Sequence, residues 1–161
     1  MIRYKKIFFG LLFLLLLGCQ AARPPDVYTW LQSKLNENFA SAEENFIVLF
    51  ISERMCAACI SKEIININQS NLSKPILIVG VFGRNRYFQS TISVISEDKF
   101  TALFINTREY LPEHLPLQPF YGVFDYQTQT IIHIFYPQYC EPWATLQYLY
   151  EIDAKLAETN Y

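Results

Sequence analysis

The pattern of hydrophobic and polar positions predicts alternating helices and strands. Residues 46–51 and 75–82 form almost continuous apolar runs rich in β-branched and aromatic side chains, a pattern typical of buried strands. Elsewhere, apolar residues recur at near-helical spacing and are separated by polar turns. We expect helices at residues 26–39, 55–68, 85–95 and 143–157, and strands at residues 46–52, 75–82, 102–105, 120–125 and 130–136.

These elements and their connections predict one α/β domain over residues 26–161. Asp26, which follows two prolines, is a suitable N-cap for the first helix. A proline-broken loop at residues 110–119 precedes the last two strands, which residues 126–129 join as a hairpin. The expected fold is a central mixed sheet flanked by helices, ending in the hairpin and a helix. In the second and third helices the side chains expected to face the core are those of Ile60, Ile64, Ile65, Ile67, Tyr87, Phe88, Ile92 and Ile95.

The first 18 residues have the pattern of an export signal. Residues 1–6 are basic, and the apolar run at residues 7–17 is too short to span a membrane as a stable helix. The sequence Leu-Leu-Gly-Cys at residues 16–19 also resembles the bacterial lipobox. This resemblance implies cleavage before Cys19 and a diacylglycerol on its sulfur, so that residues 19–25 form a lipidated tether. An ordinary signal peptide and a retained anchor are the alternatives.

Charge argues against nucleic acid as a partner. The whole chain has a formal net charge of −2, and removal of residues 1–18 takes away three basic residues and no acid, which leaves −5. An acidic protein with scattered bases is unsuited to bind a polyanion. Gln20, rather than an aspartate after the lipidated cysteine, favours the outer membrane by analogy with lipoprotein sorting. The domain would then face the periplasm from the bacterial cell envelope.

The spacing of two cysteines suggests the chemistry. Cys56 and Cys59 follow a predicted strand and open a predicted helix. At a helix N-terminus, free backbone N–H groups and the positive end of the dipole lower the pKa of a thiol. Cys56 is therefore the expected attacking thiol, and Cys59, one turn later, the expected resolving thiol. The alternatives are a permanent disulfide, an inert pair, and a Cu(I) site with the soft sulfur of Met55 beside the thiols.

The order of elements resembles the thioredoxin-like fold, and in particular the exported, membrane-tethered thiol–disulfide oxidoreductases. Cys56-Ala-Ala-Cys59 after a strand, and Pro119 directly before the next-to-last strand, carry the resemblance. It implies that Pro119 stands where the family has a cis-proline beside the C-x-x-C, and that the backbone of Gln118 pairs with a bound peptide.

The resemblance also implies a function. We expect exchange with the thiols or disulfides of exported proteins, a redox partner that the sequence does not identify, membrane attachment through the lipid on Cys19, and no cofactor or metal. The direction of exchange is not encoded in the sequence. The alternative is a non-catalytic thioredoxin-like module that holds a protein partner or Cu(I).

The chain departs from the family pattern around the thiols. Met55 stands where a tryptophan usually precedes the first cysteine, and two alanines replace the usual central residues. Without a histidine between the thiols, we expect a less strongly oxidising pair than in the Cys-Pro-His-Cys enzymes. Phe50 occupies the position of the buried acid of thioredoxins, six residues before the first cysteine. Glu53 is nearer in sequence but is expected to be exposed, so proton transfer would depend on water.

One cysteine and two histidines remain to be assigned. The predicted topology brings the last strand back toward the thiols, so the loop at residues 137–142 should lie on the same rim as Cys56. Cys140 is thus a candidate third redox thiol, although the sequence favours a buried cysteine that behaves as a small hydrophobe. His114 and His133 have no acid and nucleophile at a matching spacing, and both are expected to be structural.

Overall fold

The computed structural model describes residues 26–159 except 109–111, 113–114, 139–140 and 142. The helices are α2 (Val27–Phe39), α3 (Ala57–Gln69), α4 (Asn85–Ile92) and α5 (Ala144–Thr159), with a short 3₁₀ turn, η1 (Glu97–Lys99). The strands are β1 (Phe46–Ser52), β2 (Ile76–Phe82), β3 (Phe100–Asn106), β4 (Phe120–Asp125) and β5 (Thr130–Phe135). Each helix and strand expected from the sequence is present. The signal segment and Cys19 lie outside the described residues.

The five strands form one mixed sheet in the order β3-β2-β1-β4-β5. Strands β1, β2 and β3 are parallel, whereas β4 is antiparallel to both β1 and β5. The expected central mixed sheet is therefore confirmed. β3 is longer than expected because it pairs with β2 along its whole length, from Ile76 opposite Phe100 to Phe82 opposite Asn106.

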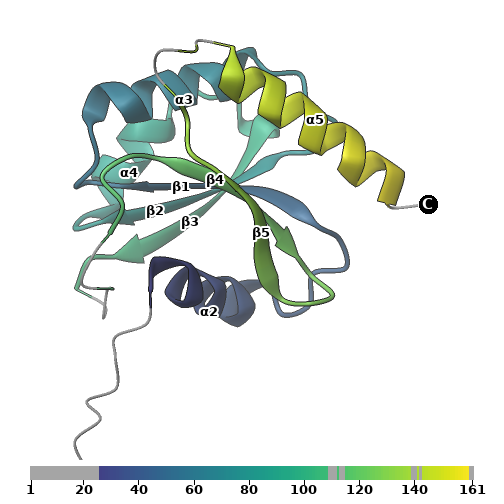
Figure 1. The fold of residues 1–161 in the computed structure, drawn as a ribbon. Coiled ribbons are helices and arrows are strands. Elements are labelled where there is room, and N and C mark those ends of the chain that lie inside the picture. Colours follow the sequence, from purple (N-terminus) through teal and green to yellow (C-terminus); the bar gives the residue numbers. More distant parts are fainter. Residues whose placement is uncertain (1–25, 109–111, 113–114, 139–140, 142, 160–161) are drawn as a thin grey trace, which may run out of the picture.

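Helix α2 lies on the opposite face of the sheet from the other α-helices (Figure 1). On one face, the rings of Phe50 and Phe120 pack against Trp30 and Tyr28 of α2. On the other face lie α3, α4 and α5; there Tyr121 contacts residues of α3 and α5. This division follows from the period of two along each strand, which sends neighbouring residues such as Phe120 and Tyr121 to opposite faces.

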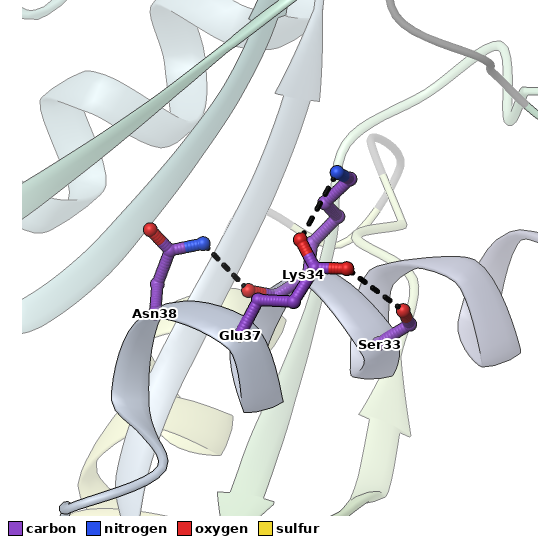
Figure 2. A network of polar contacts seen from close by, with 4 residues as sticks. All are labelled: Ser33, Lys34, Glu37 and Asn38. Atoms are coloured by element: carbon purple, nitrogen blue, oxygen red, sulfur yellow. Dashed lines mark hydrogen bonds and ion pairs between the residues drawn. The ribbon is translucent and has the colours of Figure 1, made fainter.

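Helix α2 shows how local sequence sets an element. The carboxylate of Asp26 accepts a hydrogen bond from the backbone N–H of Thr29 at 2.9 Å, which confirms the expected N-cap. The apolar stripe of α2 is buried, and its outer face carries a polar network (Figure 2). There Lys34 pairs with Glu37 at 3.1 Å, while Ser33 and Asn38 add hydrogen bonds to Glu37 and to the Lys34 carbonyl. Such exposed pairs contribute little to stability and mainly keep this face solvated.

Two side chains that were expected in the core are exposed. Ile65 of α3 and Tyr87 of α4 are each 51% exposed. The buried stripe of α3 contains Ile60, Ile64 and Ile67, and a step of one residue along a helix turns a side chain by about 100°. Tyr87 likewise lies one residue before the buried Phe88 and so points away from the core. The guanidinium of Arg86 lies 4.9 Å from the centre of the Tyr87 ring. α4 also ends at Ile92, earlier than expected.

The sheet register brings three segments to the carboxyl end of β1. Phe50 near that end pairs with Phe120, the first residue of β4, so Pro119 lies at the edge from which the chain leaves β1 toward α3. Phe135 at the end of β5 pairs with Tyr121, so β5 ends at the same edge. The expected return of the last strand toward the thiols is therefore correct. In the part of the chain that the structure describes, no helix is long and apolar enough to cross a bilayer.

Candidate active site

A short turn carries the chain from β1 to the first thiol. After Ser52 the backbone folds back, and the N–H of Met55 donates to the Ser52 carbonyl at 3.1 Å. Cys56 is then the N-cap of α3, with φ −56° and ψ 118°, and its carbonyl accepts the first helical hydrogen bond from Ile60 at 3.0 Å. The cysteine thus occupies a position where its sulfur faces the unpaired N–H groups of the first helical turn.

The sulfur of Cys56 is stabilised by hydrogen bonds at this position. It accepts a hydrogen bond from the backbone N–H of Cys59 at 3.3 Å. Donation from the thiol of Cys59, then from the backbone N–H groups of Cys59 and Ala58, lowers the pKa of Cys56 below its ordinary value of 9.0. Desolvation opposes this shift, but Cys56 is exposed. The result is an accessible sulfur with enhanced thiolate character, which is the state that attacks disulfides.

Cys59 lies one turn inward. It is the third residue of α3 and is partly buried, and both cysteines are in the thiol form. Because its thiol donates to Cys56, Cys59 stabilises the reduced pair and is placed to attack a bond formed at the Cys56 sulfur. The two expected site cysteines are therefore brought together, with the exposed one first and the shielded one second.

An open groove of about 720 Å³ borders Cys59. Besides Cys59, it is lined by Val27, by Leu115, Pro116, Leu117 and Gln118 of the proline loop, and by Tyr136. The hydroxyl of Tyr136 is hydrogen-bonded to that of Tyr28 from α2. All the lining side chains are uncharged, so the groove suits an apolar or neutral polypeptide segment.

The structure places Gln118 in this groove and buries Pro119 at the entrance to β4. The cis geometry implied for Pro119 is not found. The described part of the chain contains no cis peptide bond, so the bond between Gln118 and Pro119 is trans. A trans bond is the ordinary state, favoured by about 0.5–1 kcal/mol before proline.

Three residues that the sequence singled out near the thiols have structural roles. Met55 is buried, and its sulfur accepts a hydrogen bond from the Ser52 N–H at 3.3 Å. Binding of a metal by this sulfur together with Cys56 would require the hydrogen bond to break. Phe50 is fully buried and stacks on Phe120. Glu53 is exposed, as expected, and accepts a hydrogen bond from the Gly83 N–H at 2.7 Å.

A buried carboxyl, that of Glu63, was missed by the sequence analysis. This residue of α3 is 0% exposed and accepts hydrogen bonds from the Tyr121 hydroxyl at 3.1 Å and from the Asn66 amide at 3.2 Å. Burial raises its pKa, against the opposing effects of Asn66, Tyr121, Thr145 and the charge of Lys62. The sequence signal for this burial was spacing, because Glu63 lies on the same helix face as Ile60, Ile64 and Ile67.

Other residues considered from the sequence divide into two groups. Cys140 and His114 lie outside the described residues, so the role of Cys140 stays a prediction. His133 lies in β5 at a bulge opposite Gly122, with a positive φ of 52°. Its carbonyl accepts a hydrogen bond from the Tyr148 hydroxyl at 2.7 Å, while its side chain is exposed. His133 therefore contributes to the structure through its backbone carbonyl rather than its imidazole.

Comparison of the chain with protein-family models, with curated proteins and with solved structures gave no match.

Proposed function

We propose that this chain carries out thiol–disulfide exchange on exported proteins, with a thioredoxin-like domain tethered to a membrane. The observation that carries the proposal is the hydrogen bonding of Cys56. Its exposed sulfur caps α3, receives hydrogen bonds from Cys59, and has a lowered pKa. A permanently inert thiol would need neither the exposure nor the stabilised anion.

The placement of the pair in the sheet supports the thioredoxin-like part of the proposal. The thiols follow β1, the central strand of five, and the antiparallel hairpin of β4 and β5 begins beside them. Gln118 lies in the groove beside Cys59, where its backbone can pair with an extended partner segment.

The reaction proceeds in two exchanges. The Cys56 thiolate attacks one sulfur of a partner disulfide, the partner S–S bond breaks, and the departing partner thiolate takes a proton from water. The Cys59 sulfur, after losing its proton, attacks Cys56 and expels the second partner thiolate. The partner disulfide gains two electrons, and Cys56 and Cys59 end as a disulfide. The reverse sequence oxidises a partner dithiol, and the available electron donor or acceptor sets the direction.

Turnover of a protein disulfide tests the proposal. Insulin and dithiothreitol are mixed with the wild-type chain or with Cys56→Ser, and precipitation of reduced insulin is followed. The account predicts acceleration by the wild type and none by Cys56→Ser. Equal rates for the two proteins would overturn it. If tight Cu(I) binding accompanied those equal rates, the non-catalytic binding module would replace it.

Membrane attachment is proposed separately, on the Leu-Leu-Gly-Cys sequence that ends at Cys19. Burial of acyl methylenes, each worth about 0.8 kcal/mol, would hold the domain at the envelope, facing the periplasm, and Gln20 favours the outer membrane. Fractionation of bacteria producing the wild type and Cys19→Ser tests this. Recovery of the wild type in the outer-membrane fraction and loss of Cys19→Ser from it is the expected result, and identical fractionation would contradict it.

A further inference from the structure

Glu63 and Cys59 occupy one face of α3. They are four residues apart in a continuous helix, and residues at this spacing lie one above the other. Side chains on a helix also lean toward its N-terminus, so the Glu63 side chain is directed toward the turn that carries Cys59. The helix thus places a buried carboxyl one turn along from the more shielded of the two thiols.

The two carboxyl oxygens of Glu63 have different surroundings. Oε2 accepts the hydrogen bonds from Tyr121 of β4 and Asn66 of α3. Oε1 is fully buried and has no hydrogen-bond partner. An unpartnered buried oxygen costs free energy, about 1–3 kcal/mol, so its presence calls for an explanation. It is the kind of atom that can accept a proton.

The groups facing Glu63 come from three elements. Lys62 and Asn66 belong to α3, Tyr121 to β4, and Thr145 to α5, where Tyr148 packs against the ring of Tyr121. Of these, Lys62 and the hydrogen-bond donors favour the carboxylate, whereas burial favours the neutral acid. Burial is the largest of these effects, and it moves the carboxyl toward the range in which a group exchanges protons near neutral pH.

We propose that Glu63 is the proton acceptor for Cys59 in the resolving step. The Cys59 S–H bond breaks and its proton passes to the Glu63 carboxylate, directly or through one water. The new Cys59 thiolate attacks the Cys56 sulfur, the bond between Cys56 and the partner sulfur breaks, and the partner leaves as a thiolate that water protonates. Glu63 then returns its proton to water. The cysteine pair is oxidised by two electrons and the partner disulfide is reduced.

This proposal rests on the proposed exchange function but can be tested apart from protein substrates. A small aromatic disulfide, 5,5′-dithiobis(2-nitrobenzoate), reacts with Cys56 and releases one coloured thiolate. Attack of Cys59 on the mixed disulfide releases the second. The two phases therefore separate attack by Cys56 from resolution by Cys59. The full chain is used, with Cys19→Ser and Cys140→Ser in every sample so that only the pair reacts.

Glu63→Gln is the main variant, because it preserves the shape of the side chain and removes the base. We expect an unchanged first phase and a second phase slowed by about tenfold or more at neutral pH. The acid limb of the second-phase pH profile should also disappear. Glu53→Gln is the matched control: its exposed carboxyl is nearer to Cys56 in sequence, and its amide oxygen can still accept the Gly83 N–H. Both phases of Glu53→Gln should match the parent.

Tyr121→Phe provides a second test that does not need Glu63→Gln to fold. It removes a hydrogen bond that lowers the pKa of Glu63, so the acid limb of the second phase should move to higher pH. An unmoved limb, or an unchanged second phase in Glu63→Gln, would overturn the role of Glu63 and leave the exchange function intact. Absence of a second phase in the parent would instead show that Cys59 does not resolve Cys56, and would overturn both.

Discussion

The backbone N–H of Cys59 donates to the sulfur of Cys56 at 3.3 Å. One residue of the pair therefore stabilises the anionic form of the other, and the two are not joined in a disulfide. The same contact fixes the order of events, because the stabilised sulfur is the exposed one and its donor is the more shielded one.

Removal of the Cys59 thiol should raise the pKa of Cys56. The side-chain hydrogen bond from Cys59 is the largest cause of the lowered pKa, so in Cys59→Ala the midpoint should move up toward 9.0. The measurement is the pH dependence of alkylation of Cys56 by iodoacetamide, with Cys19 and Cys140 replaced by serine. Cys59→Ser keeps a hydroxyl donor and should show a smaller change. Equal midpoints for parent and Cys59→Ala would contradict the assigned hydrogen bond.

Ionisation of Glu63 should make the protein less stable at higher pH. Its folded-state pKa is raised above the ordinary 4.5, so the folded state holds this proton more tightly than the unfolded state does. The contribution of Glu63 to the free energy of unfolding is fully present below pH 4.5. It is lost as pH rises through the raised pKa, by about 1.4 kcal/mol for each unit of the shift. Urea unfolding of the wild type and Glu63→Gln across this range isolates the effect.

In that comparison, Glu63→Gln should gain stability relative to the wild type as pH rises. Contributions from other titrating groups are common to the two proteins and cancel in the difference. A difference that is constant with pH would show that Glu63 titrates normally in the folded protein.

Close packing at Gly80 should make β2 intolerant of a methyl group. A Cβ at this position would lie 2.2 Å from the ring of Phe88 in α4, well inside contact distance. We expect Gly80→Ala to lower the free energy of unfolding by about 1–3 kcal/mol in urea titrations. Addition of Phe88→Leu should restore part of the loss.

Gly83→Ala is the matched control for Gly80→Ala. At Gly83 the nearest atoms are the side-chain oxygens of Glu53 and Thr107 at 3.3 Å, which can move aside. Gly83→Ala should therefore lower the free energy of unfolding clearly less than Gly80→Ala does. Equal losses would show that the close approach of Phe88 does not limit β2.

Much of the fold was accessible from the sequence because single segments specify it. The apolar run of β1, the capping carboxylate of Asp26 and the thiol pair opening α3 are all local patterns. β3 was predicted too short because its limits depend on pairing with β2. Ile65 and Tyr87 were misplaced because an apolar side chain one step from the buried stripe looks like part of it.

The thiols of the candidate site were predicted, but the buried acid was not. Glu63 has the spacing of the buried stripe of α3, but it follows Ser61 and Lys62, and a charged side chain is ordinarily expected to be solvated. Its burial depends on Tyr121 and Thr145, which come from distant parts of the sequence and reach α3 only after the sheet and α5 have assembled. The inward turn of Met55 likewise depends on a contact with the Ser52 backbone, which no spacing rule predicts.

The redox equilibrium of Cys56 and Cys59 tests the central claim most directly. The full chain carrying Cys19→Ser and Cys140→Ser is equilibrated with buffers of varied reduced and oxidised glutathione, then acid-quenched and analysed for thiols by mass. The account predicts one reversible two-electron transition between the dithiol and an internal Cys56–Cys59 disulfide, whose midpoint gives the reduction potential. Thiols that stay reduced throughout, or that form only glutathione adducts without the internal disulfide, would contradict it.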